Sequence, residues 1–278
     1  MPTTINTNLV SLNTQRALAS TNNLQATAMQ RLSSGLRVNS ARDDAAGLAI
    51  AERMQAQVRG MSVSIRNAND AISLAQTAEG ALGKVSESLQ RMRELSVQAA
   101  NATNSTTDRA NLHAEFTQLS EEVARVLNAT KFNGVNVLNL AGTHAFQVGA
   151  NNDPTNQTNI VTSDLRAGAG MSAALATNLS ITGVAGAQSA MSILDEAIDE
   201  VTTARARFGA SQNRFESIIS SLETGRENQS ASRGRIMDAD FAVETANLSR
   251  AQILQQAGSA MLAQANQLPQ QVLALLRN

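Results

Sequence analysis

Apolar residues recur at intervals of three and four through the C-terminal stretch, residues 240–278. That spacing places them on one face and predicts an amphipathic helix, which Pro269 is expected to kink or break. Beyond the first residue of the stretch, only Glu244, Arg250 and Arg277 are charged. A solvent-facing helix normally carries many Lys and Glu, so this composition is typical of a helix surrounded by other protein. The apolar row comprises Leu254, Ala257, Met261, Ala265, Leu268, Val272 and Leu275, beside a second row of Phe241, Leu248, Leu262, Leu273 and Leu276.

The N-terminal stretch shows the same pattern, and Arg16 is its only charged residue before Arg31. Such helices gain most of their stability from packing, so we expect the two terminal helices to pair with each other. Two interpretations stay open: the pair is completed by neighbouring chains, or it forms an intramolecular hairpin that caps an ordinary bundle. The apolar residues are Val10, Ala17, Leu24, Ala28 and Leu32, helped by Ile5, Leu9 and Leu12.

Composition narrows the fold and the function further. Aromatic residues make up only 2% of the chain against 42% hydrophobic residues, which favours long helices packed through Ala, Leu, Val and Ile. A net charge of −1 argues against nucleic-acid binding, and the lack of cysteine excludes disulfides and thiolate chemistry. We expect no membrane insertion, because no stretch is apolar enough to span a bilayer, and the N-terminus lacks an ordinary signal peptide.

Heptad spacing dominates the interior of the chain. It predicts a helix ending near Asn101, a return helix through Phe116 and a third long helix from Ala187. The fold class is therefore mainly α: a long antiparallel coiled-coil rod with a small β region and paired terminal helices. The three rows are Val58, Met61, Ile65, Ala68, Ile72, Ala75, Leu82, Val85, Leu89 and Met92; Leu112, Phe116, Leu119, Val123 and Val126; and Ala187, Leu194, Val201, Phe208, Phe215 and Leu222.

Polar and glycine-rich segments separate these helices. Gly35 is expected to end the first helix as a C-cap, and residues 40–43 fit a capping box for the next. Residues 225–234 are expected to form a second polar break, before Asp238 or Asp240 caps the final helix.

A β region is expected in the middle of the chain. Asn133-Gly134 is a turn signal between short apolar runs, which predicts strands or hairpins up to Gly149. Residues 150–186 are rich in Asn, Thr, Gly, Ser and Ala, and we expect them to form a short exposed segment, whose Ser and Thr residues could carry glycans.

The residue types for catalysis are poorly represented. Asp43 and Asp44 are expected to stabilise a helix N-terminus rather than to form a catalytic pair, since no partner lies nearby. His113 and His144 are each solitary, without metal-ligand spacing. No glycine-rich phosphate loop is present either, so we expect neither an enzyme nor a cofactor.

Several motifs, taken in order, resemble bacterial flagellin over nearly the whole chain except residues 150–186. They are Ile5-Asn6-Thr7-Asn8, Arg31-Leu32-Ser33-Ser34-Gly35, Asp43-Asp44-Ala45-Ala46-Gly47, Arg66-Asn67-Ala68-Asn69-Asp70, Phe132-Asn133-Gly134, Phe146-Gln147-Val148-Gly149 and Ala210-Ser211-Gln212-Asn213-Arg214. The resemblance implies a short flagellin, without large outer domains, that polymerises into the flagellar filament for swimming motility. It also implies an extracellular location reached through the flagellar type III export apparatus, without a cleaved signal peptide.

The resemblance also implies a domain organisation. Residues 1–39 and 226–278 would form the two halves of an inner-tube helical domain. Residues 40–150, with the β region, and 187–225 would form the rod domain, and residues 151–186 the exposed variable segment.

Three groups of site residues follow from the same resemblance. Polymerisation contacts of the inner helices would be Ile5, Leu9, Leu12, Leu24, Leu32, Leu254, Met261, Leu268, Val272 and Leu275. A surface like that bound by the vertebrate toll-like flagellin receptor would comprise Arg91, Leu95, Gln98 and Glu115, although these residues could instead hold neighbouring rods together. Leu273, Leu276 and Arg277 resemble the part held by an export chaperone and sensed by inflammasome receptors, with polymer packing as the first expectation.

Two other functions fit part of the pattern. A hook-filament junction protein has similar ends, but the flagellin motifs continue through the rod. A coiled-coil adaptor explains the heptads but not the nearly uncharged terminal helices. As a filament subunit, the chain would also meet the filament cap and junction proteins.

Overall fold

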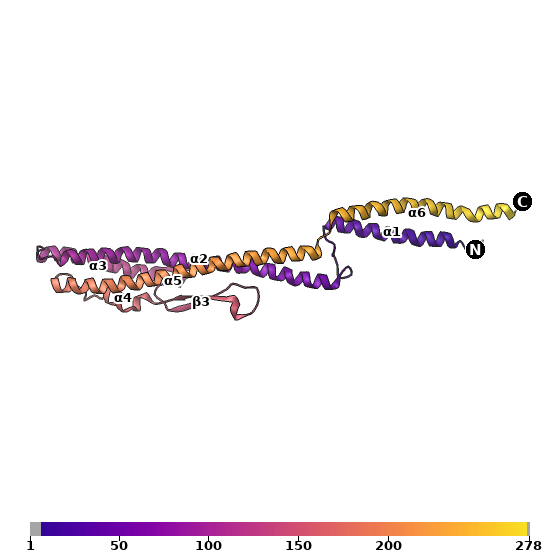
Figure 1. The fold of residues 1–278 in the computed structure, drawn as a ribbon. Coiled ribbons are helices and arrows are strands. Elements are labelled where there is room, and N and C mark those ends of the chain that lie inside the picture. The colour runs from indigo at the N-terminus through magenta and orange to yellow at the C-terminus, as the bar shows by residue number, and fades with distance from the viewer. Residues whose placement is uncertain (1–6, 277–278) are drawn as a thin grey trace. The chain divides into compact units, whose positions relative to one another are not determined.

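The computed structural model describes residues 7–276, with side chains described as far as residue 267. The chain divides into two compact units: residues 1–56 with 228–278, and residues 57–227. The described part is largely helical, which confirms the mainly α fold. The helices are α1 (Leu9–Ser34), α2 (Ala45–Ala99), α3 (Thr106–Ala129), α4 (Ala169–Ala174), α5 (Val184–Met237) and α6 (Phe241–Leu276) (Figure 1). The strands are β1 (Lys131–Phe132), β2 (Val135–Asn136), β3 (Gly142–Gln147) and β4 (Gln157–Thr162).

In the first unit, α1 and α6 lie side by side and antiparallel, as Figure 1 shows. Near the N-terminal end of α1, the Asn8 side-chain amide donates to the Ala265 carbonyl at 2.7 Å. Near its other end, Arg31 lies 2.9 Å from Glu244. The predicted pairing of the two terminal helices within one chain is confirmed.

The predicted cap at the end of α1 is also confirmed. Gly35 has φ 69°, in the left-handed region that favours glycine, and its N–H donates to the Arg31 carbonyl at 2.8 Å. The chain then pairs with the end of α5, because Arg37 N–H donates to the Met237 carbonyl at 2.7 Å. Val38, Met237 and Ala51 of α2 form a small apolar cluster there. This cluster explains why the compact first unit extends past residue 39.

The helix start after this segment differs from the prediction. α2 begins at Ala45, and the Asp44 carboxylate accepts from the Gly47 N–H at 2.8 Å. Asp43 does reach back to the Ser40 N–H at 2.9 Å, but it closes a turn instead of capping α2. Hydrogen bonds from Ser40 and from the Asn39 backbone lower the pKa of Asp43.

The second unit buries most residues of the predicted heptad rows between α2, α3 and α5. Leu82, Leu89, Phe116, Leu194 and Phe215 are among its fully or almost fully buried side chains. Phe215 meets Phe146 of β3 edge to face, with ring centroids 5.8 Å apart. At the start of α3, where the sequence predicts only a polar turn, Ser105 and Asp108 form a capping box.

Two predicted helix breaks are wrong, at residues 225–234 and at Pro269, whereas the alternative of a kink at Pro269 stays a prediction. α5 is continuous from Val184 to Met237, so residues 225–234 are helical, and α6 continues through Pro269. The chain leaves α5 after Met237, and Asp240 accepts from the N–H groups of Ala242 and Val243 at 2.9 and 3.2 Å. Polar side chains of 225–234 suit an exposed helix as well as a loop, which is why composition misplaced the break.

The β region contains two separate antiparallel pairs. Asn133 (φ 48°) and Gly134 (φ 82°) form the predicted turn between β1 and β2, with both central residues left-handed. β3 pairs with β4 in a register from Gly142 opposite Thr162 to Gln147 opposite Gln157.

Residues 151–186 are not simply an exposed segment. β4 buries alternate residues, including Ile160, and the chain after it buries Leu165, Met171 and Ile181 in the core of the second unit. The segment was predicted to be exposed because of its polar composition, which outweighed the alternation of buried and exposed residues in β4 and the few apolar residues after it.

Candidate functional site

The interface between α1 and α6 is made of small and polar side chains. Ser11, Thr21 and Ala28 of α1 are buried, as are Ala251 and Ala265 of α6. Ser11 Oγ donates to Asn266 Oδ1 at 2.8 Å, and a Cβ on Gly258 would lie 3.2 Å from Leu18. Small side chains let the two helices approach closely, so the pair holds together while many of its large apolar residues stay exposed.

Those large apolar residues lie on the exposed surface of the pair. Their exposed fractions run from 47% for Leu254 to 66% for Ile253. A monomer rarely exposes so many large apolar residues on neighbouring elements, which indicates a surface that other protein covers. We call this set the outer apolar surface; it comprises Leu9, Val10, Leu12, Leu24, Met29, Phe241, Val243, Ile253, Leu254 and Met261.

Most of the described residues predicted to mediate polymerisation belong to this surface. Leu9, Leu12, Leu24, Leu254 and Met261 are all exposed, whereas Leu32 is half-buried. Ile5 and Arg277 lie outside the described residues. Leu268, Val272, Leu273, Leu275 and Leu276 belong to α6, but their side chains lie outside the described part.

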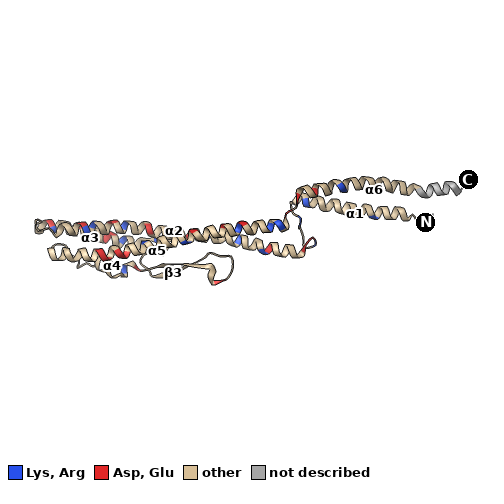
Figure 2. Cartoon of the chain, viewed as in Figure 1, with Lys and Arg blue, Asp and Glu red and all other residues tan. Residues whose placement is uncertain are grey.

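The outer apolar surface carries little charge. Figure 2 shows α1 and the described part of α6 mostly in tan. In sequence, these helices contain Arg16, Arg31 and Arg250 as their basic residues and Glu244 as their acid. Salt therefore has few charges to screen on this surface, and association through it rests mainly on apolar burial.

One ion pair within the helix pair was not predicted from the sequence. The Glu244 side chain is only 9% exposed and accepts from the Arg31 guanidinium at 2.9 Å. The sequence does contain a signal for this pair. Glu244 is the lone acid of α6 and lies near the start of that helix, and Arg31 is one of two basic residues in α1 and lies near its end. A buried lone charge predicts a partner across the interface.

A second candidate surface lies on α2 and α3. Arg91 pairs with Glu94 at 3.0 Å and with Glu115 at 2.9 Å, and these hydrogen bonds raise the pKa of Arg91. Gln98 is exposed on the same helix. Leu95 does not belong to this surface, because it is fully buried in the core of the second unit.

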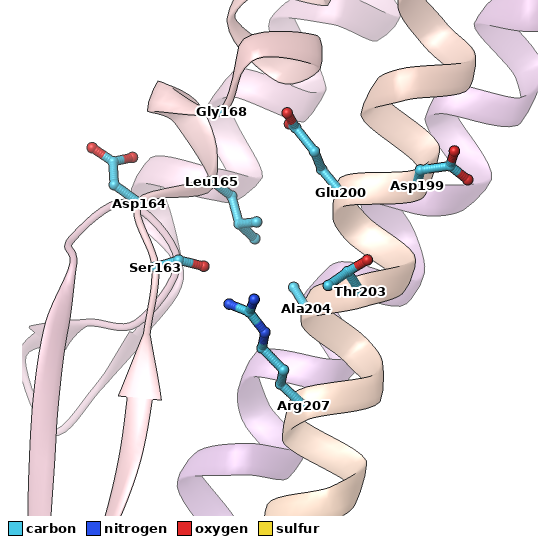
Figure 3. Close-up of a pocket in the computed structure, with 9 residues that line it drawn as sticks. All are labelled: Ser163, Asp164, Leu165, Gly168, Asp199, Glu200, Thr203, Ala204 and Arg207. Atoms are coloured by element: carbon cyan, nitrogen blue, oxygen red, sulfur yellow. The ribbon is translucent and has the colours of Figure 1, made fainter.

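A recess of about 350 Å³ is lined by three carboxylates, Asp164, Asp199 and Glu200, and two of them have structural roles (Figure 3). Glu200 accepts from the N–H groups of Gly170 and Met171 at 2.9 and 3.0 Å, so it ties α4 to α5. Asp164 accepts from the N–H groups of Arg166 and Ala167. We therefore interpret the recess as a packing defect between α5 and the segment before α4, and not as a ligand site.

The two histidines also contact their own surroundings. The His113 ring lies 6.2 Å from that of Phe116, and His144 Nε2 is 3.4 Å from Thr162 Oγ1. Over residues 7–276, no group of three His, Asp or Glu side chains is placed to hold a metal ion. Over the same residues, no helix has the length and hydropathy to cross a membrane.

Comparison with known proteins adds independent information. The family model for the bacterial flagellin N-terminal helical region matches residues 5–143, and that for the C-terminal helical region matches residues 191–276. A flagellin of Halalkalibacterium halodurans is 47% identical, with 98% of this chain and 99% of that protein covered. A flagellin of Bacillus subtilis is 42% identical, with the same coverage of both chains.

A solved structure shares the fold at lower identity. It is described as a flagellar hook-associated protein from Vibrio parahaemolyticus and is 13% identical to this chain. The TM-score is 0.58, with 70% of this chain and 100% of that chain covered. At this identity, the similarity concerns the fold alone and gives no support to a junction role over a filament role.

Proposed function

Because this chain belongs to the bacterial flagellin family, we propose that copies of it polymerise through the outer apolar surface of α1 and α6. The chain is a structural subunit of the flagellar filament and not an enzyme. The observation that supports this proposal is that the first unit exposes large apolar side chains and buries small ones. Residues such as Leu24 and Met261 are exposed, whereas Ala28 and Ala265 are buried between the helices. Burying the large side chains against another copy removes them from water, which stabilises the polymer.

The sequence-based domain organisation becomes part of this proposal. Residues 1–39 and 226–278 supply the inner-tube helices, and residues 40–150 with 187–225 supply the surrounding shell. α1 and α6 fall within the first two ranges.

The proposal is tested with Leu254→Gln and a matched control, Leu140→Gln. Both leucines are about half exposed, at 47% and 55%, but Leu140 belongs to the second unit. Filament growth from seeds is followed by sedimentation and electron microscopy. We expect Leu254→Gln to raise the critical concentration about tenfold, because polar substitution removes apolar burial repeated at every subunit.

A chain lacking residues 241–278 extends the test, and we expect it to stay soluble even with seeds. Equal growth of Leu254→Gln, Leu140→Gln and the unsubstituted chain would exclude the outer apolar surface as the polymerisation contact.

We also propose, from family membership, that the subunit is exported by the flagellar type III apparatus without a cleaved signal peptide. In this proposal the C-terminal part of α6 binds an export chaperone before assembly, and the filament meets cap and junction proteins at its ends. Inflammasome receptors of a host are proposed to sense the same C-terminal part, with Leu273, Leu276 and Arg277 as contacts.

A receptor-binding surface on α2 and α3 is a second proposal, for a host toll-like flagellin receptor. The supporting observation is the exposed set Arg91, Gln98 and Glu115, with Arg91 held in place by Glu115. Leu95 contributes by fixing the helix packing beneath this surface. Binding of the receptor ectodomain to Arg91→Ala tests the proposal, and unchanged affinity would exclude it.

A further inference from the structure

Methionine is the main easily oxidised residue of this chain. Cysteine, tryptophan and tyrosine are absent from the sequence, whereas nine methionines are present. Oxidation converts the methionine thioether, which is apolar, into a polar sulfoxide. Because the oxidant must reach the sulfur atom, the burial of each methionine indicates where an oxidant in solution acts on the folded chain.

Packing protects most of the described methionines. Met92 and Met171 are fully buried in the core of the second unit. Met61 is half-buried, and a Cβ on Gly225 of α5 would lie 3.6 Å from its sulfur, so this thioether lies against the neighbouring helix. The other protected methionines are Met54 and Met191, which are half-buried, and Met237, which is buried.

Met29 and Met261 are different, because they are 55% and 63% exposed. Among the methionines whose side chains the structure describes, these are the two exposed ones, and both belong to the outer apolar surface. Met29 lies close to Arg31, near one end of the helix pair, whereas Met261 lies close to Ala265, near the other end. The accessible thioethers are therefore placed at two separate points of the surface proposed for assembly.

Oxidation of these thioethers changes the chemistry of that surface. A lone pair of the sulfur attacks one oxygen of hydrogen peroxide, so that a sulfur–oxygen bond forms and the oxygen–oxygen bond breaks. The departing oxygen takes the proton of the transferred hydroxyl and leaves as water; the sulfur is oxidised and the peroxide is reduced. The sulfoxide oxygen accepts hydrogen bonds, and its burial among apolar side chains without a donor is unfavourable.

We propose that Met29 and Met261 are oxidation sites through which a peroxide reversibly prevents the unassembled subunit from polymerising. The inference rests on the proposed function and adds covalent regulation of the same surface. Methionine sulfoxide reductases reverse the step: a dithiol is oxidised to a disulfide, and the sulfoxide oxygen leaves as water. Neighbouring copies cover both side chains in the filament, so the sensitive species is the free subunit.

Peptide mass spectrometry of the soluble full-length chain tests where oxidation occurs. The chain is treated with hydrogen peroxide, and catalase then destroys the excess. We expect Met29 and Met261 to be oxidised at least about tenfold faster than Met92 and Met171, which are reached only through opening of the core. Equal rates at all four methionines would overturn the inference.

Growth of the oxidised chain from untreated seeds tests the consequence. We expect the critical concentration to rise at least about tenfold, because the unfavourable burial of the sulfoxides recurs at every subunit. Treatment with both methionine sulfoxide reductases, which act on opposite sulfoxide epimers, and a dithiol should restore growth. Normal growth of a chain that carries sulfoxide at both positions would overturn the inference.

A double variant, Met29→Leu with Met261→Leu, shows whether these two positions are responsible. Leucine keeps each position apolar and of similar volume but has no sulfur. We expect this variant to grow normally before and after peroxide treatment. The matched control, Met54→Leu with Met191→Leu, removes two half-buried thioethers and should remain sensitive. Equal loss of growth in the two double variants would place the damage elsewhere and overturn the inference.

Hydrogen exchange of α1 and α6 in the soluble chain excludes an effect within one subunit. We expect the same exchange rates before and after oxidation, since both side chains lie on the exposed surface of the helix pair. Faster exchange, by the same factor as the loss of assembly, would mean that the sulfoxides act by separating the two helices, which overturns the inference.

Two further measurements show which proposal has failed. If the oxidised chain assembles normally while Leu254→Gln does not, the outer apolar surface stands and the oxidation sites are wrong. If both assemble normally, the proposed function fails as well. In intact filaments, we expect Met29 and Met261 to be oxidised at least about tenfold more slowly than in the soluble chain. Equal rates would show that the surface stays uncovered, and both proposals would then fail.

Discussion

The two compact units use the same apolar periodicity in opposite ways. The second unit turns its large side chains inward, so that Leu89, Phe116 and Phe215 are buried. The helix pair of the first unit buries residues such as Ser11 and Ala251 and leaves large apolar residues such as Leu24 exposed. The second unit therefore has a complete hydrophobic core, whereas the helix pair of the first unit leaves an apolar surface exposed for further association. A helical stripe therefore shows that a helix needs a partner, but not whether that partner lies in the same chain.

The largest expected effect comes from two matched Phe→Ala substitutions. Phe215 is fully buried against Phe146, whereas Phe241 is 64% exposed on α6. We expect Phe215→Ala to lower the free energy of unfolding by about 3–5 kcal/mol, through lost burial and the cavity left behind. Phe241→Ala is expected to change it by less than about 0.5 kcal/mol.

Urea unfolding of the soluble chain, followed by circular dichroism, measures both values, and seeded growth measures assembly. Phe241→Ala is expected to weaken assembly despite its unchanged stability. If Phe241→Ala destabilised the soluble chain as strongly as Phe215→Ala, the contrast between the two units would be lost.

Local chemistry explains which parts of the fold could be predicted from the sequence. The left-handed cap at Gly35 and the Asn133-Gly134 turn depend on a few adjacent residues, and both were predicted. The heptads of α2 and α5 were predicted for the same reason, since periodicity is a property of the helix itself. The fold class followed from these signals together.

Features set by tertiary packing were harder to predict. Composition alone placed a break at residues 225–234 and an exposed loop at 151–186, where the structure has a continuous helix and a packed segment. The residues of the capping box, Ser105 and Asp108, are present in the sequence, but they lie in a polar stretch that was predicted only as a turn. Leu95 matches a receptor-like motif, yet its burial depends on neighbouring helices.

The helix pair itself can be disrupted with a smaller effect than Phe215→Ala. Ala28 is 3% exposed between α1 and α6, whereas Ala26 is exposed on the same helix. We expect Ala28→Leu to destabilise the pairing by about 1–3 kcal/mol, because extra methylene groups force closely packed helices apart. Ala26→Leu is expected to leave the pairing intact.

Hydrogen exchange of α1 amides in the soluble chain measures this effect. Exchange about 5- to 150-fold faster in Ala28→Leu corresponds to that free-energy range. Equal exchange in the two variants would show that small side chains do not govern the approach of the helices. The second unit should keep its protection in both variants, since Ala28 belongs to the first unit.

The smallest effect concerns the start of α3, which belongs to the second unit. The Ser105 hydroxyl donates to the Asp108 carboxylate at 2.6 Å and the Ser105 N–H donates at 2.9 Å, which together lower the pKa of Asp108. A carboxylate whose pKa is lower in the folded state stabilises the fold above its unfolded pKa, about 3.9, and loses that contribution as pH falls through the folded value.

We therefore expect Asp108→Asn to be less stable than the unsubstituted chain at neutral pH, with the difference shrinking below about pH 4. Ser105→Ala removes the main cause of the shift and should cost about 0.5–1 kcal/mol at neutral pH, while flattening the same part of the pH profile. Urea unfolding from about pH 2 to about pH 7 measures both variants. A difference between Asp108→Asn and the unsubstituted chain that persisted at the acid end would mean that shape, not charge, matters at this cap. Seeded assembly at neutral pH should be unaffected in both variants, because the capping box lies in the unit that buries its own large apolar residues.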